Sequence, residues 1–321
     1  MDNEMGRLIL IPQYPTKLRY QEWWFTEFPE QFSEYFDSVL VLGRDYVYNS
    51  SAPRPEDFAP LGLSIRFETQ QLKELFALDI KPDDRLLLCD MSYPGILPSA
   101  LIHIDCKKYA ICHATSRNRY DYFAKVRHTK WPIENATAKI FDKIFVGSQY
   151  HAYKIGWDNV VVSPLPLPRP GFAGTLNHVP YLERSKQIIS VSRPTKQKTN
   201  LKVERRISKE FGIDIERPQG LENWNDYYRF LQNSKIMLLT SQEETFGYQV
   251  IDAFLNGVVP LAPNKYSYPE LLSSDVLYNN IEELKMLITK WLNKENTYPT
   301  LKTLKASIQF YSTLTQHMKD D

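Results

Sequence analysis

Short runs of apolar residues alternate with longer amphipathic stretches along the chain, which is the pattern of an α/β protein. In the first half the apolar runs are nearly continuous, as expected for strands of a parallel sheet covered on both faces. The predicted strands span residues 8–11, 39–42, 86–89, 109–112, 144–146 and 160–162. The predicted helices lie between them, near 22–36, 67–78, 96–105, 132–141 and 149–155.

A proline-rich segment interrupts this alternation. The twelve residues 163–174, SPLPLPRPGFAG, contain four prolines and two glycines. Because proline lacks a backbone N–H and holds the residue before it extended, this segment predicts a stiff connector. We therefore predict an N-terminal domain over 1–165, a Pro-rich hinge over 166–180 and a C-terminal domain over 181–321. The last helix is a candidate to cross back to the first domain.

The alternation of strands and helices then restarts. Predicted strands span 188–191, 213–215, 236–239 and 258–262, and predicted helices span 199–211, 222–232 and 245–256. A last helical region runs from about 281 to 316 and is broken near Pro299. The fold class that we predict is α/β, with two Rossmann-like doubly wound domains facing a cleft. Ligands of such sheets bind beyond the carboxyl ends of the strands.

Composition and charge exclude several classes of protein. The chain has 321 residues, and 39 Lys and Arg against 38 Asp and Glu leave a net charge of +1, so no global field attracts nucleic acid or membrane. The three cysteines show no CxxC spacing, which argues against a zinc ribbon or a disulfide scaffold. No basic leader and no run of 18 apolar residues is present, so we expect no membrane insertion and a cytoplasmic protein, in the host cytoplasm if the protein is viral.

Two loops of the second half place polar residues at strand ends. Strand 188–191 runs into Ser192-Arg193-Pro194-Thr195-Lys196-Gln197-Lys198, and strand 236–239 runs into the loop 240–247. Both loops enter helices, whose N-termini attract anions. Arg193 and Lys198, with amides such as that of Gly247, suit a diphosphate. The alternative is that both cations are ordinary exposed side chains.

Two acidic residues flank the start of the helix that follows. Glu244 precedes this helix and Asp252 lies eight residues later within it, a rise of about 12 Å. That span approximates the distance from a sugar ring to a nucleoside ribose across a diphosphate. The alternative is that Asp252 is a satisfied carboxylate on the wet face of the helix.

The segment 243–272, EETFGYQVIDAFLNGVVPLAPNKYSYPELL, resembles the Glu-x7-Glu segment of retaining GT-B glycosyltransferases of the glycogen-synthase-like and sucrose-synthase-like kind. The Arg-x4-Lys pair of that family matches Arg193 and Lys198, and its closing Pro-Glu matches Pro269-Glu270. The second acid is shortened to Asp252 here. The Gly-rich loop after the first strand is missing, and Pro12-Gln13-Tyr14-Pro15 stands in its place.

The resemblance implies transfer of a hexose or pentose from a nucleoside-diphosphate sugar with retained anomeric configuration. It assigns the catalytic positions to His113, Arg193, Lys198 and Glu244. It assigns donor binding to Thr245, Phe246, Gly247, Tyr248 and Asp252. No cofactor is expected beyond the sugar nucleotide itself. No Asp-x-Asp triplet occurs, so no metal site is predicted and the reaction is expected to be metal-independent.

The first domain is expected to hold the acceptor. The segment 117–130 contains five Lys and Arg against one Asp, with aromatic residues interleaved. Cations beside aromatic rings suit phosphates and unstacked bases. The acceptor-side candidates are Tyr14, Arg117, Arg119 and Tyr120. A hydroxylated DNA base, as modified by phage-type DNA-base glycosyltransferases, and a carbohydrate both remain open, and the same residues could equally be a solvated loop and core aromatics.

Other classes also remain open. A nucleotide-sugar epimerase of the same fold would use an acid–base group, for which His113 is available. A non-catalytic nucleotide-sugar or nucleic-acid binding protein would bind its ligand without turnover. The sequence does not determine the oligomeric state.

Overall fold

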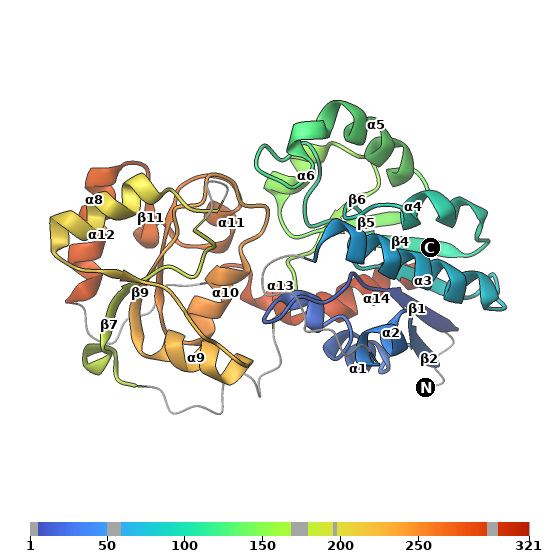
Figure 1. Cartoon of the computed structure of the whole chain (residues 1–321), viewed down its shortest axis with the longest axis horizontal. Coiled ribbons are helices and arrows are strands. Elements are labelled where there is room, and N and C mark those ends of the chain that lie inside the picture. Colours follow the sequence, from blue (N-terminus) through green and yellow to red (C-terminus); the bar gives the residue numbers. More distant parts are fainter. Residues whose placement is uncertain (1–5, 50–58, 168–178, 195–197, 294–300, 321) are drawn as a thin grey trace. The chain divides into compact units, whose positions relative to one another are not determined.

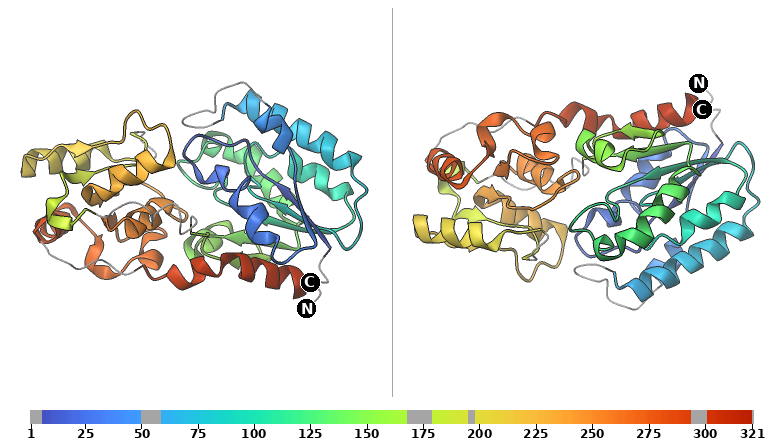
Figure 2. Two further views of the ribbon diagram at one scale, coloured as in Figure 1. Left: turned by 90° about the horizontal axis from the view of Figure 1, so that it is seen from below. Right: turned by 90° about the horizontal axis from the view of Figure 1, so that it is seen from above.

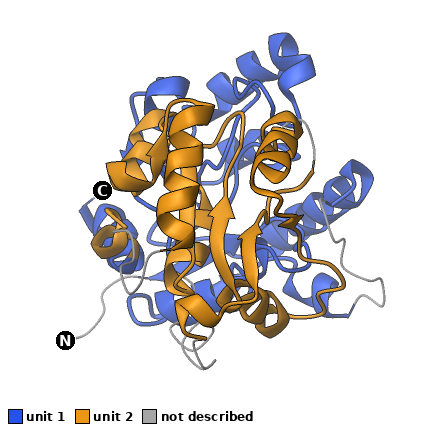
Figure 3. Ribbon diagram, turned by 90° about the vertical axis from the view of Figure 1, so that its left-hand side faces the viewer, with its two compact units in different colours: residues 1–147, 151–166, 308–321 blue, residues 148–150, 167–307 orange. Residues whose placement is uncertain are grey.

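The computed structural model describes residues 6–49, 59–167, 179–194, 198–293 and 301–320. The chain divides into two compact units (Figure 3). Unit 1 comprises residues 1–147, 151–166 and 308–321, and unit 2 comprises residues 148–150 and 167–307. Most of the predicted hinge, residues 168–178, lies outside the described residues.

Unit 1 is built on a six-stranded parallel sheet (Figure 1). Its strand order is β2-β1-β3-β4-β5-β6. Strand β2 is therefore added on one side of β1, and strands β3 to β6 are added on the other side. The strands are β1 (Arg7–Ile11), β2 (Ser38–Val41), β3 (Arg85–Leu88), β4 (Lys107–Ile111), β5 (Lys143–Val146) and β6 (Val160–Val162).

Helices cover both faces of this sheet, because alternate residues of each buried strand point to opposite sides. They are α1 (Glu27–Phe32), α2 (Arg44–Tyr48), α3 (Leu61–Ala77), α4 (Leu97–Ala100), α5 (Arg127–Ala138), α6 (Gln149–Ile155) and α14 (Phe310–Asp320). On one face Ile9, Leu86 and Ile144 pack in one cluster with residues of α3 to α6. Helix α14 lies on the face opposite α3 (Figure 2).

The C-terminal helix α14 is part of unit 1 although it is last in the chain. Phe310 packs on Phe28 of α1 with ring centroids 5.8 Å apart. Arg85 of β3 donates from Nε to the carbonyl of Met318 at 3.2 Å. These contacts fix α14 against α1 and the sheet of unit 1. The short helix α13 (Leu304–Ile308) precedes it.

Unit 2 contains a five-stranded parallel sheet in the order β11-β10-β9-β7-β8. Its strands are β7 (Lys186–Ile189), β8 (Ile215–Glu216), β9 (Ser234–Leu238), β10 (Val259–Pro263) and β11 (Leu277–Tyr278). Its helices are α8 (Leu201–Phe211), α9 (Trp224–Gln232), α10 (Tyr248–Leu255), α11 (Tyr268–Leu271) and α12 (Ile281–Leu292). The predicted class, two Rossmann-like α/β domains, is therefore confirmed.

Asparagine side chains start three helices of unit 2. Asn200 accepts a hydrogen bond from the amide of Val203 at the start of α8, at 3.4 Å. Asn223 and Asn280 cap α9 and α12 in the same way. Each cap satisfies a backbone N–H that has no partner inside the helix, and so it fixes where the helix begins.

Candidate functional site

The two polar loops of unit 2 follow strands, as predicted from the sequence, and these strands are neighbours in the sheet. Strands β7 and β9 are paired in parallel, so the loops that leave their carboxyl ends emerge at the same edge of the sheet. Lys198, in the loop after β7, has its Nζ 3.5 Å from Oε2 of Glu244, in the loop after β9. The structure therefore brings one predicted cation and the predicted acid together.

In this pair the side chain of Glu244 is more buried than that of Lys198. The side chain of Glu244 is 11% exposed and that of Lys198 is 34% exposed. Oε1 of Glu244 also accepts a hydrogen bond from the amide of Thr245 at 3.1 Å. The carboxylate is thus held by a cation and an amide, and a charged ligand would meet both groups in a partly dehydrated setting, where electrostatic interactions are stronger than in water.

Arg193 lies in the same loop as Lys198. Its carbonyl accepts a hydrogen bond from the hydroxyl of Thr199 at 2.7 Å, which closes the loop on itself. Residues 195–197 lie outside the described residues, so the loop is characterised only at its two ends. The Arg193 side chain is half-buried.

A buried carboxylate supports both loops from behind. Glu204 of α8 is 5% exposed and accepts hydrogen bonds from Ser190 at 3.0 Å and from Thr240 at 3.4 Å. Arg217 donates both to Glu204 and to the carbonyl of Ser192. One acid therefore links the carboxyl ends of β7 and β9. Sequence reasoning missed Glu204 and Arg217, because only the packing of three strands brings them together.

The predicted donor residue Asp252 lies on α10 and is 8% exposed. Its Oδ2 accepts a hydrogen bond from the hydroxyl of Tyr227, on α9, at 2.9 Å. A second link joins the same two helices, since Gln232 Nε2 donates to Asn256 Oδ1 at 3.2 Å. A satisfied carboxylate was one of the two possibilities for Asp252 in the sequence, and the structure shows that this carboxylate has a protein partner.

The start of α10 is tightly packed. Gly247, the N-cap residue, has φ +104°, a conformation that residues with a side chain rarely adopt. A Cβ on Gly247 would lie 3.3 Å from Cδ1 of Leu271. Ser267 donates to the carbonyl of Phe246 at 2.9 Å, and the Ser148 hydroxyl donates to the carbonyl of Thr245. The predicted donor residues 245–248 are therefore held in one fixed turn.

The Glu of the Pro-Glu motif accepts two backbone hydrogen bonds. The carboxylate of Glu270 accepts hydrogen bonds from the amides of Gln149 and Tyr150, both at 2.7 Å. These amides belong to the first turn of α6, where a negative charge is favourable. In the described residues, Glu270 is a helix-capping acid.

In unit 1, His113 follows β4 and is held in a neutral form. Its Nε2 lies 3.2 Å from the carbonyl oxygen of Cys89, and its ring packs against Tyr20 and Trp24 at centroid distances of 4.8 and 5.5 Å. Burial lowers the pKa of His113 to about 4. The ring is therefore uncharged at neutral pH, and it cannot act as a general acid there.

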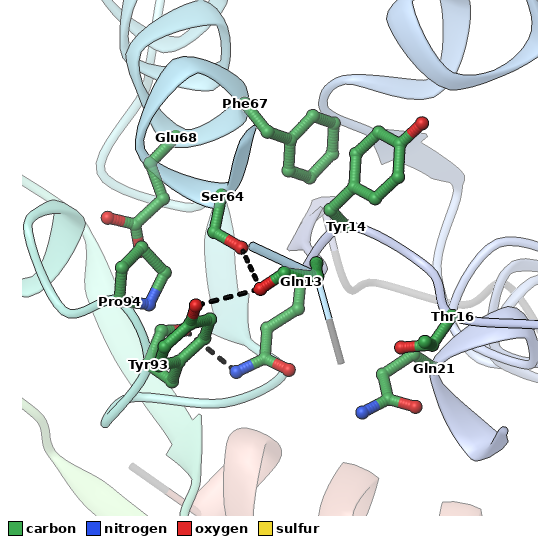
Figure 4. Close-up of a pocket in the computed structure, with 10 residues that line it drawn as sticks. Gln13, Tyr14, Thr16, Gln21, Ser64, Phe67, Glu68, Tyr93 and Pro94 are labelled. Atoms are coloured by element: carbon green, nitrogen blue, oxygen red, sulfur yellow. Dashed lines mark hydrogen bonds between the residues drawn. The ribbon is translucent and has the colours of Figure 1, made fainter. Parts of the chain in front are cut away.

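A narrow pocket lies beside the carboxyl ends of β1 and β3, where the strand order of unit 1 reverses (Figure 4). Gln13 and Tyr14 follow β1, Tyr93 follows β3, and Glu68 comes from α3. Tyr93 donates from its hydroxyl to the carbonyl of Ala59 at 2.8 Å, and Gln13 donates to the carbonyl of Tyr93 at 2.7 Å.

The pocket contains two unusual polar groups. Gln21 is 6% exposed, and its Oε1 has no hydrogen-bond partner among the described residues. Burial raises the pKa of Glu68 to about 7, although backbone amides such as that of Ile96, at 2.9 Å, oppose this shift. Tyr14 is 3% exposed and meets Phe67 edge to face at 84°, so this predicted acceptor residue forms part of the pocket wall.

The other acceptor-side candidates lie at the surface of unit 1. Arg117 and Arg119 are exposed, and Arg119 lies over the ring of Tyr120 at 5.3 Å. The structure does not bring Tyr14 together with them in the pocket. The described residues include no group of three or more His, Cys, Asp and Glu that could hold a metal ion, and no described helix has the length and apolarity to cross a membrane.

Comparisons with known proteins agree with this geometry. Residues 188–306 match the family model described as glycosyl transferases group 1. A tRNA-queuosine alpha-mannosyltransferase of Drosophila melanogaster is 36% identical over 59 residues, which are 18% of this chain and 16% of that protein.

Solved structures resemble the whole chain at low sequence identity. Sucrose-phosphate synthase from Thermosynechococcus elongatus has a TM-score of 0.62 at 14% identity, over 98% of this chain and 94% of that one. An alpha,alpha-trehalose-phosphate synthase from Burkholderia vietnamiensis has a TM-score of 0.60 at 11% identity, over 98% and 96% of the two chains. The chain therefore has the fold of the GT-B glycosyltransferases, and its residues 188–306 match the family model described as glycosyl transferases group 1.

Proposed function

We propose that the protein transfers a sugar from a nucleoside-diphosphate sugar to an acceptor hydroxyl, with unit 2 holding the donor. The observation that carries this proposal is the pairing of Lys198 with Glu244, 3.5 Å apart, in the loops after two adjacent parallel strands. The family match over residues 188–306 covers both of these loops.

The chemistry of the paired loops suits this reaction. When the bond to the sugar breaks, negative charge develops on the departing diphosphate. A cation at Lys198, a second at Arg193 and amide N–H groups before α10 would stabilise that charge more strongly than they stabilise the bound substrate. The hydrogen bonds that Glu204 accepts from Ser190, Thr240 and Arg217 would hold the two loops in place, so the loops would not need to rearrange during sugar transfer.

We further propose that the transfer retains the anomeric configuration and needs no metal ion. Retention is supported by the resemblance of the 243–272 segment to retaining enzymes. Metal independence is supported by the absence of an Asp-x-Asp triplet from the sequence. The transferred group is a hexose or a pentose.

For the acceptor, we propose a hydroxyl on a modified base of an RNA. The curated relative is by name an enzyme that modifies a nucleoside of tRNA, although the match spans only a small part of either protein. A base must leave its stack to be modified, and aromatic side chains such as those in unit 1 suit an unstacked base. A hydroxylated DNA base and a carbohydrate are the alternatives that the experiment must separate.

The epimerase alternative is not favoured by the site. It depended on His113 as an acid–base group. Burial lowers the pKa of His113 to about 4, so its ring is uncharged at neutral pH and could accept a proton but has no imidazolium proton to donate.

The test begins with the donor. UDP-glucose, GDP-mannose and ADP-glucose are added separately, and the thermal unfolding temperature is measured, because a ligand that binds only the folded form stabilises it. The stabilising donor, radiolabelled in its sugar, is then incubated with RNA, hydroxymethylated DNA and oligosaccharides. We expect label to be transferred to a polymer.

Two variants connect the activity to the site. Glu244→Gln and Arg193→Ala should each abolish transfer while the unfolding temperature stays close to that of the natural protein. Lys209→Ala, an exposed lysine on α8, is the matched control and should keep full activity. Full activity in both site variants would disprove the proposal, and binding of the donor without turnover on any acceptor would favour a binding protein instead.

A further inference from the structure

Four cations lie exposed on one segment of unit 1, between β4 and the first turns of α5. They are Arg117, Arg119, Lys125 and Arg127, and we call them the cationic strip. The net charge of the whole chain is only +1, so the strip is a local concentration of charge on a nearly neutral protein.

The cationic strip differs from other cations of unit 1 in its ion pairs. In the part of the chain that the structure describes, no carboxylate forms an ion pair with any of its four members. Elsewhere in unit 1 such pairs occur, for example Arg7 with Asp84 at 2.6 Å and Lys107 with Asp142 at 3.0 Å. Like charges that gather without a partner repel one another, and an anionic ligand would relieve that repulsion.

The charge of Arg117 also affects the pKa of a neighbouring lysine. Lys154 of α6 has a lowered pKa, first because it is partly buried and second because the charge of Arg117 disfavours its protonated form. Positive charge thus extends from the cationic strip to α6.

The other two charged residues of the segment, Asp121 and Lys130, are half-buried. Lys130 donates to the carbonyl of Pro94 at 3.2 Å and lies over the ring of Phe123 at 4.5 Å. Burial raises the pKa of Asp90, and the charge of Asp121 raises it further. Four of the five cations counted in the sequence are therefore exposed.

Aromatic and apolar groups accompany the cations. The guanidinium group of Arg117 lies over Trp131 at 5.0 Å, and that of Arg119 over Tyr120 at 5.3 Å. Tyr122 and Val126 are 51% and 52% exposed. An Arg whose planar group rests on a ring is already oriented, so it loses less freedom when it binds a phosphate.

The scaffold beneath the strip is firmly held. At its start, the amide and hydroxyl of Ser116 both donate to the buried carboxylate of Glu134, at 3.0 and 2.5 Å. On α5, Trp131 stacks on Trp157 with ring centroids 5.6 Å apart and planes 2° apart. The strip begins four residues after His113, at the edge of the sheet where ligands of parallel sheets bind.

We propose that the cationic strip binds the phosphate backbone of an RNA acceptor. Four separate cations match a polymer of phosphates better than a single small anion, and exposed rings suit the unstacked bases that RNA loops present and duplex DNA does not. This proposal rests on the proposed function, because it assigns the partner of the same enzyme.

The test measures binding of a fluorescently labelled tRNA transcript by anisotropy, at several salt concentrations and without a sugar donor. Four phosphate contacts predict that the logarithm of the association constant falls with the logarithm of salt with a slope of about −3. Arg119→Glu/Lys125→Glu/Arg127→Glu should weaken binding at least tenfold. The control Arg66→Glu/Lys73→Glu/Lys319→Glu makes the same change in net charge at exposed positions of unit 1 outside the strip and should bind nearly as the natural protein does.

Three results with nucleic acids would overturn the proposal: equal RNA binding by the two triple variants, affinity that does not depend on salt, or equally tight binding of a duplex DNA of the same length. Binding to phosphatidylglycerol vesicles in place of RNA would also overturn it. Two measurements made without RNA, donor hydrolysis and thermal stabilisation by the donor, test the proposed function separately from RNA binding. A strip variant that loses RNA but still hydrolyses the donor supports both, whereas a natural protein that binds no sugar nucleotide disproves the function itself.

Discussion

The hydroxyl of Tyr227 donates a hydrogen bond to Oδ2 of Asp252 at 2.9 Å, and this bond orients the acid that the family resemblance assigns to the donor ribose. The aspartate is one methylene shorter than the family's glutamate, so its carboxylate reaches less far from α10. Tyr227, on the neighbouring helix α9, fixes the direction in which that shorter side chain points.

Tyr227→Phe should therefore raise the KM for the donor about fivefold, equivalent to ~1 kcal/mol for one hydrogen bond, and leave kcat nearly unchanged. The measurement is steady-state kinetics with the donor identified by thermal stabilisation. Tyr153→Phe, at an 88% exposed tyrosine, is the control. An unchanged KM in Tyr227→Phe would show that the hydroxyl does not act through Asp252.

Lys198→Ala should reduce kcat at least a hundredfold, because the lost cation stabilises charge that develops only in the transition state. Its effect on the unfolding free energy should be small, at most about 1 kcal/mol, since the Lys198–Glu244 pair is partly solvated. Lys202→Ala, at an exposed position on α8, should be indistinguishable from the natural protein. A large loss of stability in Lys198→Ala would instead indicate a structural ion pair.

Gln21→Leu should stabilise the protein in the absence of ligand, by about 1 kcal/mol, because a buried carbonyl oxygen without a partner is removed. Gln71→Leu is the contrasting case, because Gln71 also has a buried Oε1 without a partner among the described residues but its Nε2 makes two hydrogen bonds. Gln71 Nε2 donates to the carbonyls of Pro12 and Leu42 at 2.8 and 3.1 Å, so its loss leaves two acceptors unpaired and should destabilise unit 1. Denaturant unfolding compares the two, and destabilisation of both to the same extent would contradict this account of the pocket.

The stability of the protein should depend on pH through Glu68. Burial raises its pKa from 4.5 to about 7, so the folded protein binds a proton that the unfolded chain releases in this interval. The contribution of Glu68 to the free energy of unfolding is therefore fully present below pH 4.5 and is lost as the pH rises to about 7. Glu68→Gln should remove this part of the pH dependence, which is measured as the difference in unfolding free energy between the two proteins from pH 4.5 to 7.5. If the difference in unfolding free energy between the two proteins stays constant from pH 4.5 to 7.5, Glu68 is not the source of the pH dependence.

Much of the fold could be predicted from the sequence, because buried parallel strands appear as continuous apolar runs. All ten predicted strands correspond to observed strands, with ends that differ by a few residues. Strand β11 has two residues and helices α2 and α11 have five and four, too few to show a period, and none of them was predicted. Helix α3 begins at Leu61, earlier than the predicted start at residue 67.

The candidate site was predictable only in part. The proximity of Lys198 and Glu244 follows from the rule that loops of adjacent parallel strands share one edge. The bond from Tyr227 to Asp252 could not be predicted, because it depends on the packing of two helices. Tyr14 was predicted as an acceptor-side candidate, but its burial was not predicted, because it arises where α3 places Phe67 against its ring.

Calorimetric titration with UDP, GDP and ADP tests the central claim most directly, because it asks whether the paired loops of unit 2 bind a nucleoside diphosphate. We predict that one of the three binds the natural protein with one-to-one stoichiometry, and that Lys198→Ala weakens its binding at least tenfold while Lys202→Ala does not. No binding by any of the three nucleotides, or equal affinity in the two variants, would contradict the claim.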